Sequence, residues 1–200
     1  WFSTLAPENR SILYPSVSGS FVFSQAFENA PSWLNFGKLR AAYAEVGSDT
    51  DVAPYSNSLF YGINGNLFAG QPVGGSSGTS VPNANLKPMR TSEQEIGLEL
   101  KLFKNRVNID AAVYKKLTSD QIVQAQISDA SGFQTSLINS GKSQNKGLEL
   151  MLNIVPIRSN DFSWDITFTG AHNITKVLSL LTDKPGDRIT TGTHVFNGEQ

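Results

Sequence analysis

The chain has 200 residues, enough for one domain of ordinary size or two small ones. It contains no cysteine, which excludes a disulfide scaffold, a thiolate metal site and a cysteine nucleophile. The net charge of −1 leaves no global basic field to hold nucleic acid or an anionic membrane surface, so we expect no nucleic-acid partner. Charged residues make up 16%, against about 25% in a typical soluble domain, and small polar residues are abundant. This composition favours an all-β protein over a helical bundle.

No apolar run approaches the roughly 18 residues of a membrane helix, and no secretory leader is visible. The chain opens at Trp1 without a methionine and ends at Gln200 in the middle of a pattern. We therefore expect a piece of a longer polypeptide, residues 1–200 forming one partial domain, and a missing leader would then say nothing about compartment.

Six segments alternate apolar and polar residues with a period of two, which is typical of β-strands with one apolar and one polar face. In the third segment, for example, Ile96, Leu98 and Leu100 alternate with Glu95 and Glu99. The predicted strands cover residues 17–24, 38–45, 93–102, 107–113, 148–154 and 162–169.

The connections alternate between short and long, which predicts antiparallel neighbours whose long loops emerge at one end. Residues 47–90 and 118–146 form the long connections. The first carries the run Gly74–Gly78, which lacks the strand-to-helix setting of a phosphate loop and is expected to be a flexible loop. It also carries four aromatic residues that could stack on sugar rings or contact a partner, or simply pack within the loop: Tyr55, Phe60, Tyr61 and Phe68.

The turn between strands three and four can take two registers. A turn at Asn105-Arg106 places Lys101 opposite Asp110, whereas a turn at Lys104-Asn105 places Glu99 there, a like-charge pair. Opposed like charges destabilise a sheet by some tenths of a kcal/mol, so the first register is preferred. Both registers put the apolar faces of the two strands on the same side.

Two environments fit this pattern: a secreted β-sandwich, such as a carbohydrate-binding or adhesion module, and a transmembrane β-barrel. The predicted strands are longer than the roughly 5–6 residues of globular strands and approach the roughly 9–11 residues that span a bilayer. The short turns at one end and long loops at the other are typical of outer-membrane barrels. Four aromatic residues near strand ends suit interfacial girdles: Tyr43, Tyr114, Phe162 and Trp164.

Six strands cannot close a membrane barrel, because the smallest have about eight and plugged transporters about 22. An open edge in hydrocarbon would leave unpaired backbone groups at several kcal/mol each. For the barrel environment, the expected fold is therefore an all-β, antiparallel up-and-down barrel segment of about six strands within a larger barrel, which has about 22 strands if it is a plugged transporter.

The sequence resembles the later barrel region of SusC/RagA-like TonB-dependent outer-membrane transporters over roughly residues 10–180. Six motifs carry the resemblance in order: Tyr14-Pro15-Ser16-Val17-Ser18; Leu39-Arg40-Ala41-Ala42-Tyr43 with Gly47; Asn85-Leu86-Lys87-Pro88 with Gly97-Leu98-Glu99; Asn105-Arg106 with Tyr114-Lys115-Lys116-Leu117-Thr118; Asn139-Ser140-Gly141 with Asn145-Lys146-Gly147-Leu148-Glu149; and Phe162-Ser163-Trp164 with Asn173 to Val177. The family's usual Trp-Glu after Leu-Lys is replaced by Pro88-Met89-Arg90.

This resemblance implies nutrient import through a barrel in the outer membrane of a Gram-negative bacterium, with oligosaccharides or peptides as substrates. It implies a SusD-like surface lipoprotein as a lid, contact with outer-membrane lipid, and TonB coupling through parts of the protein outside this chain. The polar strand faces would then line the lumen, facing plug or solute, with these residues: Lys38, Arg40, Glu95, Glu99 and Asp110.

Catalytic chemistry has little support in the sequence. Glu93, Glu95 and Glu99 have the spacing of a glycosidase pair, but a hydrated strand face is the favoured interpretation. His172 and His194 are the only histidines, a poor basis for a metal site or a triad. We expect no catalytic residues, no cofactor and no metal.

Overall fold

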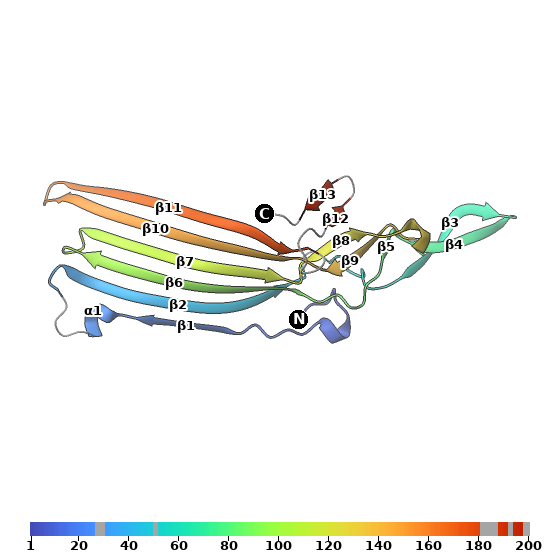
Figure 1. Ribbon diagram of the computed structural model, residues 1–200, viewed down its shortest axis with the longest axis horizontal. Coiled ribbons are helices and arrows are strands. Elements are labelled where there is room, and N and C mark those ends of the chain that lie inside the picture. Colours follow the sequence, from blue (N-terminus) through green and yellow to red (C-terminus); the bar gives the residue numbers. More distant parts are fainter. Residues whose placement is uncertain (27–30, 50–51, 181–187, 192–193, 198–200) are drawn as a thin grey trace.

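The computed structural model describes residues 1–26, 31–49, 52–180, 188–191 and 194–197. Its main element is one antiparallel sheet with the strand order β1-β2-β6-β7-β10-β11 (Figure 1). The strands are β1 (Ser16–Phe21), β2 (Leu34–Ser48), β6 (Met89–Leu102), β7 (Val107–Ser119), β10 (Lys142–Arg158) and β11 (Ser163–Ser179). The predicted six antiparallel strands are confirmed.

Five of the six strands run further than predicted, mainly toward the end that carries the long connections. β11 continues to Ser179 and β7 to Ser119, where both faces carry polar side chains. The backbone ladder continues there, but the apolar alternation that reveals a strand in the sequence has ended.

The long connections contain further strands (Figure 1). β3 (Phe60–Phe68) and β4 (Gln71–Ser77) form a hairpin that projects from the loop end of the sheet. A small sheet joins β5 (Ser80–Val81), β8 (Ile122–Gln126) and β9 (Thr135–Asn139). The remaining elements are η1 (Pro7–Asn9), α1 (Phe23–Ala26), η2 (Asp129–Ser131), β12 (Arg188–Thr191) and β13 (His194–Asn197).

The flexible loop predicted at Gly74–Gly78 is wrong for most of its length, because β4 extends to Ser77. Gly74 and Gly75 pair with Ile63 and Gly62 of β3. Backbone hydrogen bonds to β3 order a segment whose composition alone suggested a loop.

Residues Phe103–Arg106 form the tight turn between β6 and β7. Phe103, Lys104 and Asn105 all adopt left-handed backbone conformations, with φ of 52°, 58° and 60°. The side-chain oxygen of Asn35 accepts hydrogen bonds from the backbone N–H groups of Lys104 (2.6 Å) and Asn105 (3.4 Å). This side chain supports a turn that would be strained on its own.

The preferred register of this hairpin is wrong. Glu99 lies opposite Asp110, the like-charge pair that the pairwise argument rejected. Lys38 and Arg40 of β2 ion-pair with the two carboxylates, so the third strand removes the penalty. The apolar faces of β6 and β7 do lie on the same side, as expected, with Leu98 opposite Ala111.

The apolar face of the sheet is open. Phe21 is 53% exposed and Phe168 58%, and a β-sandwich would bury both. The structure therefore excludes the sandwich alternative. One row of directly opposed residues on this face crosses all six strands: Phe21, Leu39, Leu98, Ala111, Leu150 and Gly170.

The buried apolar cluster of the described residues lies away from the sheet face. Leu5, Val52, Leu86 and Ile122 are almost fully buried together and come from the N-terminal segment and the long connections. This cluster anchors the loop end, whereas the strands supply a wall with an unburied apolar side.

Exposed aromatic rings gather at the short-turn end of the wall. Trp33 and Phe103 lie with ring centroids 6.4 Å apart, and Phe162 and Trp164 are exposed beside the β10–β11 turn. The girdle position predicted for Tyr114 is wrong, because this residue pairs with Glu95 on the polar face. Among the described residues, no helix has the length and apolar character to cross a membrane.

Candidate functional site

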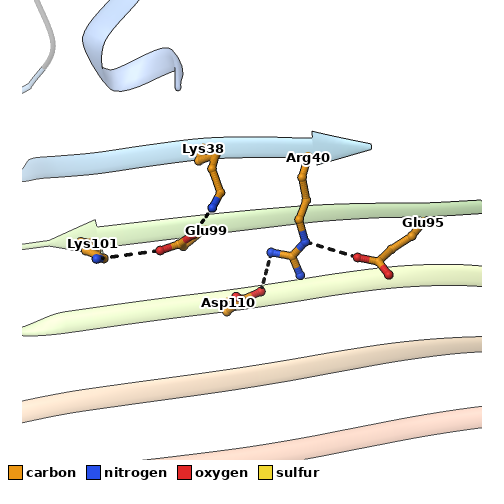
Figure 2. Close-up of polar contacts among 6 residues, drawn as sticks. All are labelled: Lys38, Arg40, Glu95, Glu99, Lys101 and Asp110. Carbon is orange, nitrogen blue, oxygen red and sulfur yellow. Dashed lines mark hydrogen bonds and ion pairs between the residues drawn. The ribbon is translucent and has the colours of Figure 1, made fainter. Parts of the chain in front are cut away.

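The five residues predicted to face a lumen lie on the polar side of the sheet and form two adjacent ion-pair groups, which we call together the polar-face network (Figure 2). Lys38 Nζ is 2.6 Å from Glu99 Oε2. Arg40 Nε is 3.3 Å from Glu95 Oε1, and its terminal nitrogen is 3.0 Å from Asp110 Oδ1. The network joins β2, β6 and β7, three strands that are adjacent in the sheet.

Arg40 links β6 and β7 because it contacts a carboxylate on each of these strands. Its side chain starts on β2, crosses β6 and reaches Asp110 on β7 (Figure 2). The crossing point is Gly97, the residue directly opposite Arg40. A guanidinium presents several donors in a fixed plane, so one arginine can bond two carboxylates at different angles.

Lys101 extends the network toward the short-turn end, and the sequence analysis did not place it there. Its Nζ lies 3.9 Å from Glu99 Oε1. Phe36 of β2 lies near both flanking ammonium groups, 5.3 Å from Lys101 and 5.9 Å from Lys38. These distances are within the range of cation–π attraction. The correct register was the missing signal, since it pairs Lys101 with Asn108 and leaves it beside Phe36.

Other polar side chains bridge the strands on the same face. Lys116 of β7 pairs with Glu93 of β6 at 3.2 Å. Asn153 of β10 accepts a hydrogen bond from Asn108 of β7 and donates one to Thr167 of β11, both at 3.0 Å. Each neighbouring pair from β6 to β11 thus shares side-chain contacts on this face, which fixes the polar surface as one unit.

A hollow of about 460 Å³ lies beside the network, lined in part by Arg40, Asp110, Glu149 and Met151. Glu149 of β10 is exposed, and the described part of the chain places no cation in ion-pair contact with it. The hollow therefore contains the carboxylate of Glu149, which has no ion-pair partner among the described residues, beside the paired Arg40 and Asp110. This arrangement favours binding of a cationic group from outside this wall.

The three glutamates of β6 are each held by a cation, Glu93 by Lys116, Glu95 by Arg40 and Glu99 by Lys38. Within the described residues, no three histidine, aspartate or glutamate side chains are grouped to hold a metal ion. His172 is exposed on the apolar side of β11 opposite Leu148, and His194 lies in β13.

The structure brings together only two of the four predicted contact aromatics. Tyr55 and Phe60 make an edge-to-face contact with ring centroids 6.1 Å apart. Tyr61 and Phe68 each stand 78% exposed on β3, within the projecting hairpin. The packing interpretation thus applies to the first pair, whereas the second pair offers free rings at the loop end.

Comparison with known protein families agrees with a wall that has one apolar and one polar face. Residues 1–197 match the family model described as TonB dependent receptor-like, beta-barrel. The chain belongs to this family. Its barrels lie in the outer membrane, so the exposed apolar face of the sheet is the lipid-facing side of a barrel wall.

Individual relatives agree with a SusC/RagA-like member of the TonB-dependent receptors. TonB-dependent receptor P26 of Formosa agariphila is 31% identical over 180 residues, 89% of this chain and 18% of that protein. TonB-dependent receptor SusC of Bacteroides thetaiotaomicron is 28% identical over 203 residues, 95% of this chain and 20% of SusC. The chain thus spans about a fifth of the length of these curated relatives.

The fold of this TonB-dependent receptor segment also matches a solved structure. The RagAB peptide importer in its open-open state superposes with a TM-score of 0.83 at 21% identity, covering 98% of this chain and 21% of that one. The six-stranded wall is therefore an arrangement that a complete receptor barrel contains.

Proposed function

We propose that this chain forms one section of the barrel wall of a TonB-dependent importer that moves oligosaccharides or peptides across the outer membrane. The observation that carries the proposal is the two-sided wall: an exposed apolar face and, opposite it, a polar face fixed by ion pairs across β2, β6 and β7. Such a wall suits lipid on one side and a hydrated, plugged lumen on the other. The likeness to SusC and to the RagAB peptide importer supports the same class of function.

In this function the wall makes no covalent change in the substrate. Lys38, Arg40, Glu95, Glu99 and Asp110 face the plug or the solute, and Glu149 adds an unneutralised carboxylate beside them. The mutual ion pairs keep these charges in place, so that movement of a plug along the lumen leaves the wall unchanged. Energy for that movement comes through TonB, which couples to parts of the protein outside this chain.

The projecting hairpin contributes to the outer face of the importer. Tyr61 and Phe68 present exposed rings at the end where outer-membrane barrels carry their extracellular loops. Aromatic rings are the side chains that most often anchor contacts with a partner. We assign them to contact with a SusD-like surface lipoprotein that closes over the substrate.

Transport is tested by deleting the gene of the complete receptor and measuring uptake of labelled oligosaccharide mixtures and labelled peptide mixtures. We expect one of the two uptakes to fall and to return when the wild-type gene is restored. Unchanged uptake of both mixtures would contradict the proposed function.

The hairpin is tested in the complete receptor by replacing Tyr61 and Phe68 with alanine and measuring capture of the partner lipoprotein from detergent extracts. The matched control exchanges the rings, Tyr61→Phe with Phe68→Tyr, because it keeps the aromatic surface. We expect loss of capture only for the alanine variant. Equal capture by both variants would show that the partner does not bind through these two rings.

A further inference from the structure

Three lysines gather on the lipid-facing side of the wall, at the loop end of the apolar belt. Lys115 of β7 lies directly opposite Lys146 of β10, and Lys176 of β11 is diagonal to Lys146. Opposed residues in a sheet have Cβ atoms about 5 Å apart, and diagonal ones about 7–8 Å. All three are exposed. We call them the lysine cluster.

These lysines have no counterion in the part of the chain that the structure describes. Every lysine or arginine of the polar-face network pairs with a carboxylate, as Lys116 does with Glu93. On the lipid-facing side of β7, β10 and β11 the described residues include no aspartate or glutamate. The acidic residue on that side of β2, Glu45, is already bonded to Tyr43 and Arg90.

Two lysines opposed in a sheet repel each other, so the arrangement costs stability unless an anion lies between them. On the polar face, by contrast, the neighbouring Lys116 is paired with the carboxylate of Glu93. We therefore expect the lysine cluster to bind an anion that the described residues do not supply.

The position of the lysine cluster along the strands, relative to the membrane, indicates where that anion comes from. Lys115 and Lys146 lie in the row immediately beyond the last row that is apolar on β6, β7 and β10, which contains Ile96, Val113 and Leu148. Lys176 lies one row further, opposite Gln144. Four apolar rows, about 20 Å along the strands, lie between the cluster and the short turns. Lipid-facing bands of outer-membrane barrels are about 25 Å tall, so the lysine stems reach the headgroup level.

We propose that the lysine cluster binds the phosphate groups of lipid headgroups in the outer leaflet, those of lipid A. The inference rests on the long loops being extracellular, as they are in outer-membrane barrels. Clusters of basic side chains beside a membrane segment bind phosphorylated headgroups through charge, and each lysine near an anionic surface adds to the affinity. The bound phosphates would replace the missing counterions and hold this side of the barrel at a fixed depth.

The test uses the complete receptor reconstituted in phosphatidylcholine bilayers that contain lipid A, followed by detergent extraction and measurement of the lipid A that stays bound. The test variant replaces Lys115, Lys146 and Lys176 with glutamine, and we expect retention to fall at least about tenfold. The triple arginine variant keeps the charge and is expected to retain lipid A. The Lys116→Gln variant changes an adjacent lysine of the polar face and is also expected to retain it.

Two further arms identify the source of the anion. Bilayers with dephosphorylated lipid A should leave wild-type receptor with as little bound lipid as the glutamine variant. Inorganic phosphate at the concentration of lipid A should not displace the bound lipid, and displacement would overturn the proposal in favour of a free-phosphate site. Equal retention by wild type and the glutamine variant would overturn it as well. An import defect from the gene deletion is independent of these outcomes, so failure of one proposal leaves the other standing.

Discussion

The side chain of Arg40 lies directly over the backbone of Gly97. A Cβ atom added at Gly97 would stand 2.4 Å from both Cζ and Nε of Arg40 and 2.8 Å from its Cγ. The absence of a side chain at this one position lets the arginine cross from β2 to Asp110 on β7. Glycine in the middle of a strand weakens it through entropy, so this position carries a cost that the ion-pair network offsets.

We predict that Gly97→Ala displaces Arg40 and destabilises the complete receptor by about 1–3 kcal/mol, the usual range for overpacking. The contact includes Cγ, near the root of the side chain, so rotation of the guanidinium alone cannot relieve it. The measurement is the free energy of unfolding in denaturant, in lipid vesicles.

Gly170→Ala is the matched control, because nothing lies within 4 Å of a Cβ built there. In an Arg40→Ala background the cost of Gly97→Ala should largely disappear, since the clashing group is gone. An equal cost of Gly97→Ala in both backgrounds would show that the arginine is not the cause.

Arg40→Ala alone is predicted to destabilise the hairpin of β6 and β7 by about 1 kcal/mol or less, because these ion pairs are partly exposed. The cause is the opposed pair Glu99 and Asp110, which then lacks one of its cations. Asp110→Asn in the same chain removes the repulsion and should restore most of the loss. A double-mutant cycle on the unfolding free energy checks this, and additive losses would contradict it.

The register of the β6–β7 hairpin could not be predicted from the sequence. A comparison of two strands, taken in isolation, rejects Glu99 opposite Asp110. The observed register depends on Lys38 and Arg40, whose strand lies more than fifty residues earlier in the sequence. The apolar alternation predicts the strands and their faces, because it reflects one local property, but it carries no information about which third strand supplies a counterion.

The position of Tyr114 and the β3–β4 hairpin were also missed, for two different reasons. Proximity to a strand end suggested an interfacial ring, yet Tyr114 continues the polar alternation of Asn108 and Asp110 and lies over Gly147 on that face. The hairpin contains Gly74 and Gly75, and its strand conformation depends on pairing with β3 rather than on propensity. Of the candidate site, the charged residues of the polar face were predictable and their connections were not.

The orientation of the wall is tested by two neighbouring residues of β10. Leu150 is 45% exposed on the lipid-facing side, and Met151 is 44% exposed on the polar side opposite Asp110. An arginine on the lipid-facing side near mid-membrane costs about 2–4 kcal/mol. We therefore predict that Leu150→Arg lowers the unfolding free energy by that amount.

Met151→Arg should cost little, because the new guanidinium lies opposite Asp110 on the polar face, which the proposed function places in a hydrated lumen. Both variants remove an apolar side chain of similar exposure, so the difference reports the environment of each face. The comparison is made by denaturant unfolding in vesicles and by the amount of folded receptor in the outer membrane. A larger loss for Met151→Arg than for Leu150→Arg would reverse the assignment of the two faces.

Tyr114 covers Gly147 in the same manner as Arg40 covers Gly97. A Cβ at Gly147 would lie 2.4 Å from Cζ of the ring, so the ring lies against the bare backbone of Gly147. Aromatic side chains that cover a glycine on the neighbouring strand stabilise the pair.

Tyr114→Ala is predicted to cost about 1 kcal/mol, the upper range for a cross-strand contact. Tyr114→Phe should cost less, because the ring remains. Gly147→Ala should be tolerated better in the Tyr114→Ala background than in wild type, and a cycle with no coupling between the two positions would show that the ring does not stabilise this strand pair.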